Sequence, residues 1–299
     1  MTSRFTRYAW TFLAATVAVI LWGGYVRATG SGAGCGAHWP LCNGEVVPRV
    51  PALATLIEFG HRVSSGVLGL MTIALVVGAF RTFPRGSGVR RAAVATGVLV
   101  IIEAAIGAGL VLFEYVAFDP RIARAYWMGA HLANTFLLLA AATLTAWRAG
   151  RPEAGPFRPG PAAAVALVAT LVLGVSGAIT ALGDTLTVHG GLDPAQNAVV
   201  GALVGLRLYH PILAGLVLLT VAWNADAARR AGAEARRFAV AALALFVLQM
   251  GVGFLNVALH APVWLQIVHL FVNDLIWIAL VLSAAAGAVG GQWTGGSRQ

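Results

Sequence analysis

Long apolar stretches separated by short polar segments run along the whole chain. Eight of them contain the roughly 20 mostly apolar residues that a helix needs to cross the hydrocarbon core of a bilayer. They are, approximately, Tyr8–Arg27, Leu56–Phe80, Ala92–Phe113, Tyr126–Trp147, Pro161–Leu182, Leu206–Trp223, Phe238–Leu259 and Pro262–Ala288. None alternates apolar and polar residues as a barrel strand does. The pattern predicts an all-α integral membrane protein with eight transmembrane helices.

The composition agrees with this interpretation. The chain is 59% hydrophobic and 10% charged, whereas a soluble domain is about 25% charged. We expect the first stretch to be retained as a helix, because no small-residue cleavage site follows it and seven further stretches do.

The charged residues indicate how the chain is oriented. All 20 basic residues are arginines, and the net charge is +9. If the chain starts inside and crosses eight times, 14 of them fall on the starting side, namely Arg4, Arg7, Arg81, Arg85, Arg90, Arg91, Arg148, Arg151, Arg158, Arg229, Arg230, Arg236, Arg237 and Arg298. The other side keeps Arg27, Arg49, Arg62, Arg121, Arg124 and Arg207. This positive-inside bias predicts a multi-pass protein with both termini in the cytoplasm, and it argues against nucleic acid as a partner.

The two halves of the chain repeat one pattern on either side of the polar loop Arg148–Gly160. Three matches occur in the same order: Glu58-Phe59-Gly60-His61 with Arg207-Leu208-Tyr209-His210, Glu103 and Gly107 with Gln249 and Gly253, and His131-Leu132-Ala133-Asn134 with His269-Leu270-Phe271-Val272-Asn273. Because four spans return the chain to its starting side, the repeat has the same orientation in both halves. We therefore expect two units, residues 1–150 and 151–299.

One histidine lies near the outer end of every even-numbered span: His61, His131, His210 and His269. At 1.5 Å per residue, all four lie roughly 6–11 Å below the outer ends of the expected helices. Ionisable residues at such depth are costly and usually serve a function. Four histidines at the same depth therefore predict a ligand site inside the membrane.

Haem iron is the ligand that suits these histidines best. Two facing helices can each give one imidazole to a haem iron. Structural zinc prefers a tetrahedral cluster with thiolates or carboxylates, and no thiol lies within a span. A di-iron centre needs two Glu-x-x-His motifs, and only Glu58 and His61 form one. Some b-type cytochromes carry two well-separated histidines on one helix and so hold haems at two depths. This chain has only one such histidine per helix, which argues against that arrangement. The pattern favours two bis-histidine haem sites, one in each half.

The halves differ beside the first histidine of each pair. Glu58 precedes His61 by three residues and shares its helix face, whereas Arg207 stands at the matching point of the second half. A carboxylate beside a metal site is a candidate general acid or base, although Glu58 could instead pair with Arg62. Arg62 and Arg207 could bind haem propionates or extend to the membrane interface.

Four other residues are harder to interpret. Glu103 and Asp274 are intramembrane acids that lack the Glu-x-x-His spacing, so we expect supporting roles for them. Cys35 and Cys42 share the first outer loop. In an oxidising compartment they could form a disulfide, which could be structural or redox-active. Two free thiols are the alternative.

Taken together, these motifs resemble the haem A synthase family. The resemblance rests on Gly23-Gly24-Tyr25-Val26-Arg27, the loop with Cys35 and Cys42, Glu58-x-x-His61-Arg62, His131-Leu132-Ala133-Asn134-Thr135-Phe136, Gly177-Ala178-Ile179-Thr180-Ala181-Leu182-Gly183-Asp184, Tyr209-His210-Pro211 and Gln266-x-x-His269-Leu270. It implies two four-helix bundles related by pseudo-twofold symmetry. The first would hold the substrate haem and the second a resident haem b.

The resemblance also implies an activity, the oxidation of the C8 methyl group of haem O to the formyl group of haem A. His210 and His269 would ligate haem b, and His61 and His131 would border the substrate. Glu58 would transfer a proton or activate the methyl-derived intermediate. Some relatives carry a second cysteine pair between spans five and six, which is missing here.

The partners implied are haem O synthase, a membrane electron acceptor or donor such as a quinone, the assembling terminal oxidase and the lipid of a bacterial cell membrane. Small-residue runs such as Gly107-Ala108-Gly109 also permit a homo-oligomer. Two alternative functions remain open. A diheme b-type cytochrome would explain the four histidines but not Glu58. A haem-binding or haem-transporting protein would explain a hydrophobic cavity but would need at most one exchangeable haem site.

Overall fold

The computed structural model describes residues 2–295 and consists almost wholly of helices. The long helices are α1 Thr2–Ala28, α2 Leu53–Thr82, α3 Gly88–Leu112, α4 Ile122–Ala149, α5 Pro161–Asp184, α6 Ala198–Ala231, α7 Ala233–Ala258 and α8 Val263–Gly295. All eight are long and apolar enough to cross a membrane. The prediction of an all-α membrane protein with eight spanning helices is confirmed.

Local sequence explains where several helices begin. The side chain of Ser87 accepts the backbone N–H of Arg90 and caps α3, and Pro161 occupies the first turn of α5. Asn197 caps α6 by accepting two backbone N–H groups. Ser87 and Asn197 satisfy amide donors that have no partner within the first turn, and Pro161 has no N–H that would need one. As a result α6 begins at Ala198, well before the start near Leu206 that we predicted from apolarity.

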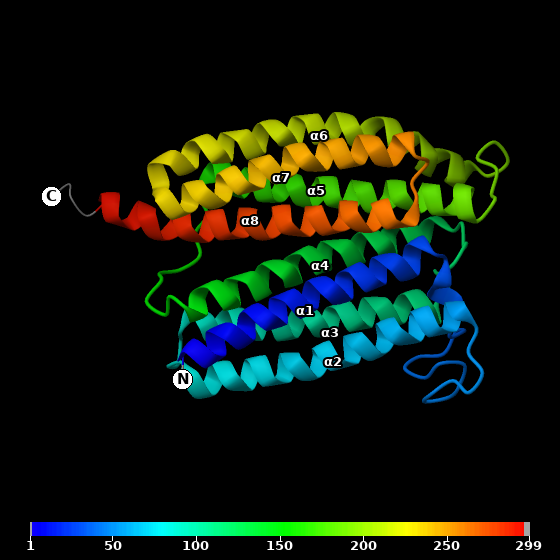
Figure 1. Cartoon of the computed structure of the whole chain (residues 1–299), viewed down its shortest axis with the longest axis horizontal. Helices are drawn as coiled ribbons and strands as arrows, with labels where there is room; N and C mark the ends of the chain where they lie inside the picture. Colours follow the sequence, from blue (N-terminus) through cyan, green and yellow to red (C-terminus); the bar gives the residue numbers. More distant parts are fainter. Residues whose placement is uncertain (1, 296–299) are drawn as a thin grey trace.

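The helices form two groups of four, α1–α4 and α5–α8 (Figure 1). Within the first group α1 and α3 each pack against both α2 and α4. Within the second group α5 and α7 likewise pack against both α6 and α8. The helices that carry the four histidines are therefore the diagonal pairs, α2 with α4 and α6 with α8.

The two groups meet along α4 and α8, which pack against each other and are the most buried helices. In both, 56% of the most apolar stretch is buried, against 33% or less in the others. Trp277 of α8 stacks on Phe136 of α4 with ring centroids 4.7 Å apart. Its indole N–H also donates to the Phe136 carbonyl oxygen at 2.7 Å. Each group thus places one of its histidine-bearing helices at the centre of the molecule.

Candidate functional site

The four histidines belong to the diagonal helix pairs of the two groups, α2 with α4 and α6 with α8. His61 and His131 lie close enough to interact electrostatically, and His210 and His269 do the same. All four side chains are only half-buried. Within residues 2–295, no hydrogen bond occupies Nε2 of any of the four. Each pair therefore offers two free imidazole nitrogens from facing helices, which is the donor set of a bis-histidine haem.

The first histidine of each pair packs directly against a glycine on the preceding helix. A Cβ atom on Gly23 of α1 would lie 2.9 Å from Cε1 of His61. A Cβ atom on Gly177 of α5 would lie 2.9 Å from Cε1 of His210. Any larger residue would displace the imidazole, because carbon atoms in contact stay about 3.5–4.0 Å apart. Glycine therefore allows each ring to approach the neighbouring backbone.

The second histidine of each pair repeats this arrangement. A Cβ atom on Gly107 of α3 would lie 4.0 Å from Cε1 of His131, and one on Gly253 of α7 would lie 3.2 Å from Cε1 of His269. Every imidazole thus faces a glycine of the preceding helix. This geometry follows the sequence repeat, which matched positions 107 and 253.

A network of ionic hydrogen bonds surrounds Glu58, which is only 3% exposed. The backbone N–H of Cys35 donates to Oε2 of Glu58 at 2.8 Å. Arg62 donates to Oε1 through Nε at 3.1 Å and through Nη2 at 2.5 Å. Nη1 of Arg62 also donates to the carbonyl oxygens of His38 and Leu41, at 2.6 and 2.7 Å. Arg62 therefore ties Glu58 to the loop between α1 and α2.

That loop is closed by a disulfide between Cys35 and Cys42. Both cysteines are buried, with exposures of 0% and 1%. Pairing of the two was one of the options left open by the sequence, and the free-thiol alternative is excluded. Since Cys35 also binds Glu58, the disulfide loop and the carboxylate form one connected unit.

A second carboxylate, Glu103 of α3, lies beside His131. Oε1 of Glu103 is 3.4 Å from Nδ1 of His131. The Asn134 amide donates to Oε2 at 2.6 Å, and the Thr135 hydroxyl donates to Oε1. We had expected only a supporting role for Glu103. Its closeness to His131 could not be read from spacing, because the two residues belong to different helices.

Beside the second histidine pair, a neutral amide stands at the position of Glu103. Gln249, the counterpart of Glu103, donates to the backbone carbonyl of His269 at 2.9 Å. Nδ1 of His210 is hydrogen-bonded to the Ser176 hydroxyl at 2.9 Å. This bond fixes the ring orientation of His210 and leaves Nε2 for a ligand.

Arginines line the outer rim of the second pair. Arg207, one turn before His210, forms an ion pair with Asp184. Arg27 of α1 crosses between the helix groups and donates to the carbonyl of Ala181 at 3.2 Å and to the Gln266 amide oxygen at 2.9 Å. No motif in the sequence connects Arg27 with the second half.

Residues 2–295 contain no cluster of three or more histidine, cysteine or acidic side chains that could hold a metal ion. Asp274 of α8 is completely buried, and neither of its carboxylate oxygens has a hydrogen-bond partner within that described range.

Known proteins are similar in sequence to this chain. A protoheme IX farnesyltransferase of Thermus thermophilus is 45% identical over 296 residues, which cover 95% of this chain and 48% of that protein. The chain thus spans about half the length of that relative. A haem A synthase of Symbiobacterium thermophilum is 31% identical over 265 residues, 84% of each chain. A haem A synthase of Alkalihalophilus pseudofirmus is 44% identical over 95 residues, 32% of each chain.

Residues 6–281 match the protein family described as cytochrome oxidase assembly protein. The match includes all four histidines, Glu58 and the disulfide loop. The chain therefore belongs to the cytochrome oxidase assembly protein family, together with the haem A synthases.

Proposed function

We propose that this chain is a haem A synthase, which oxidises the C8 methyl group of haem O to the formyl group of haem A. The observation that best supports this proposal is that different residues accompany the two histidine pairs. Glu58 and Glu103 accompany the first pair, whereas Arg207 and Gln249 stand at the matching positions of the second. At these two matching positions the first half carries carboxylates that can exchange a proton, whereas the second half carries a fixed cation and a neutral amide. Family membership supports this assignment.

In this proposal residues 151–299 form the half that holds a resident haem b. His210 and His269 would bind its iron through Nε2, and the Ser176 hydroxyl would keep the His210 ring in place. When bound, haem b supplies one-electron transfer. Arg207 would balance propionate charge at the outer rim, where it lies beside Asp184.

Residues 1–150 form the half that holds haem O as substrate, and a pseudo-twofold axis relates the two halves. His61 and His131 would hold the substrate, and Glu103 would orient the His131 ring. Glu58 would accept a proton at Oε2, the oxygen that receives a single hydrogen bond. Arg62 and Cys35 hold the carboxylate in place, and the disulfide loop shields it from water.

The relatives and the charge pattern suggest the surroundings in which this enzyme works. Because a relative named protoheme IX farnesyltransferase contains a region like this chain, we infer that haem O reaches the first half from a farnesyltransferase. A quinone would exchange electrons with the second half, and haem A would pass to an assembling oxidase. The arginine distribution favours a bacterial cell membrane with both termini in the cytoplasm.

The proposal is tested by pigment extraction from cells that contain a haem O source, with and without this chain. We expect chromatography to detect haem A only when the chain is expressed. Unchanged haem O together with a b-type spectrum would instead support the diheme electron carrier.

Replacing Gly177 should reduce the binding of the resident haem. Gly177→Leu forces a side chain into the His210 ring, because even its Cβ atom would lie 2.9 Å from Cε1. We expect the haem-to-protein ratio of the purified protein to fall about tenfold, since a misplaced ligand typically costs about 1–3 kcal/mol. Gly215→Leu is the matched control, because a Cβ atom at Gly215 of α6 meets no atom within 4 Å. Equal haem content in both variants would contradict the assignment.

Arg62 should act as a positioning residue for Glu58. Arg62→Gln removes the ion pair and loosens the disulfide loop, so we expect kcat for haem A formation to fall by about tenfold to a hundredfold. Arg62→Lys keeps the charge and should recover part of that loss. The pH dependence of kcat is the decisive measurement. Loss of the Arg62 cation should shift the part of the pH profile that reports the protonation of Glu58, whereas a purely structural role of Arg62 would leave the pH profile unchanged.

A further inference from the structure

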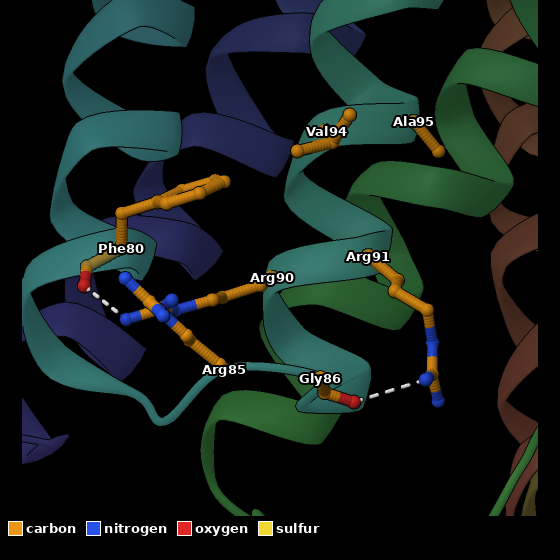
Figure 2. A pocket seen from close by; sticks show the side chains of 7 residues that line it. All are labelled: Phe80, Arg85, Gly86, Arg90, Arg91, Val94 and Ala95. Carbon is orange, nitrogen blue, oxygen red and sulfur yellow. Dashed lines mark hydrogen bonds between the residues drawn. The ribbon is translucent and has the colours of Figure 1, made fainter.

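An open cavity of about 820 Å³ lies at the turn between α2 and α3, at the end of these helices opposite the histidines (Figure 2). Its walls combine two kinds of side chain. Three are the arginines Arg85, Arg90 and Arg91, and three are the apolar Phe80, Val94 and Ala95. No residue of either proposed haem site lines this cavity.

The three arginines have no acidic partner among the residues that the structure describes. Among the described residues none of them forms an ion pair with a carboxylate, and no acidic residue occurs in the sequence between Glu58 and Glu103. Backbone carbonyls hold two of them, because Arg90 donates to Phe80 at 2.5 Å and Arg91 donates to Gly86 at 2.9 Å. Nε of Arg90 is buried without a partner.

The corresponding turn of the second half is different. Between α6 and α7, Arg229 and Arg230 lie 3.6 and 3.8 Å from the carboxylate of Asp226. Glu234 of α7 pairs with Arg151 at 2.6 Å. Positive-inside topology alone would explain cations at both turns. At the α2–α3 turn, by contrast, the cations that line the cavity have no ion-pair partner among residues 2–295.

The apolar wall narrows the class of ligand. Phe80 and Val94 are 49% and 41% exposed, and both belong to membrane-spanning helices. Figure 2 shows Arg85 and Arg90 pointing into the space between α2 and α3, with Phe80 above them. A soluble anion would use the arginines alone. A ligand with a phosphate and a hydrocarbon chain would use both surfaces.

We propose that this cavity binds an anionic phospholipid. Its phosphate would lie against Arg85 and Arg90, with Arg91 at the edge of the cavity, and an acyl chain would follow Phe80, Val94 and Ala95. Basic pockets between transmembrane helices on the cytoplasmic side suit such headgroups, and arginine pairs well with phosphate. The charge pattern places this turn on the cytoplasmic side. The site is independent of the proposed enzymatic activity.

The test is native mass spectrometry of the full-length chain in detergent, titrated with phosphatidylglycerol or phosphatidylcholine. We expect phosphatidylglycerol to bind preferentially. Arg90→Gln should weaken its binding about fivefold, and the triple variant R85Q/R90Q/R91Q by at least about tenfold, since each cation near an anionic lipid contributes about 1 kcal/mol. The matched control R229Q/R230Q should change the affinity less than about twofold. Equal binding by the triple variant and the wild type would overturn the proposal.

A second variant separates phospholipid from free phosphate. Ala95→Trp keeps all three cations but fills the apolar wall, so it should weaken phosphatidylglycerol binding and leave inorganic phosphate unaffected. Haem content and thermal unfolding would verify that each variant is folded. Displacement of the lipid by millimolar phosphate, or equal affinity for phosphatidylcholine, would contradict a phospholipid site.

Discussion

Replacing Glu58 by glutamine is expected to stop haem A formation while leaving a haem b bound. The amide keeps the size of the side chain but cannot accept the proton that we assign to Oε2. General acid–base groups typically contribute a factor of about 10²–10⁴, so we expect haem A production to fall by at least about a hundredfold. Extracted pigments, separated by chromatography, give the ratio of haem A to haem O directly.

The control for this experiment is Glu114→Gln, an exposed acid in the outer loop between α3 and α4. It should leave both the haem A yield and the b-type absorbance unchanged. Full activity in the Glu58 variant would remove Glu58 from the mechanism. Loss of the b-type spectrum in that variant would also contradict the account, because Glu58 would then support the resident haem.

Replacing His269 by alanine is expected to remove the resident haem. His269 belongs to the pair that has Arg207 and Gln249 where the first pair has Glu58 and Glu103, and its electrostatic partner is His210. We expect the haem b content of the purified protein to fall below about a tenth of the wild-type value, because a single imidazole binds haem iron much less firmly than two. The ratio of pyridine haemochrome absorbance to protein provides the measurement.

His61→Ala is the matched variant in the other half, since it deletes an imidazole of the same depth and helix type. It should retain haem b and lose haem A formation. If His61→Ala loses the haem and His269→Ala keeps it, the two halves have been assigned the wrong way round.

The two halves share the same packing around their histidines but differ in the polar side chains beside them. In both, a glycine of the preceding helix lies against each imidazole, as Gly23 and Gly177 do for His61 and His210. The scaffold is therefore repeated, and the polar groups around it differ. Glu103 faces an imidazole nitrogen, whereas Gln249 only donates to a backbone carbonyl. Substituting an amide for an acid removes a charge but preserves the packing.

Most of the fold could be predicted because apolarity and length determine membrane helices. All eight stretches correspond to helices in the structure. Helix boundaries were less certain, since a helix can continue beyond the apolar core. For α6 the prediction began near Leu206, yet the helix extends back to Ala198. The Asn197 cap was a signal in the sequence that would have located this start.

Contacts within one helix were predictable, and contacts between helices were not. Glu58 and His61 share a face because they lie three residues apart. The sequence offered either a propionate or Glu58 as the partner of Arg62, and in the structure Arg62 binds Glu58 and the outer loop. The contact of Glu103 with His131 depends on the register of α3 against α4. Side-chain packing sets that register, and no motif in the sequence encodes it.

The central claim is that each half holds one haem iron between the imidazoles of diagonal helices. A cryo-electron microscopy map of the protein purified from haem-replete cells and then loaded with haem O tests it most directly. We predict one macrocycle between α6 and α8, with its iron bound by His210 and His269, and a second between α2 and α4 beside Glu58. Imidazoles that point apart with no macrocycle between them, or a single haem between the two helix groups, would contradict the account.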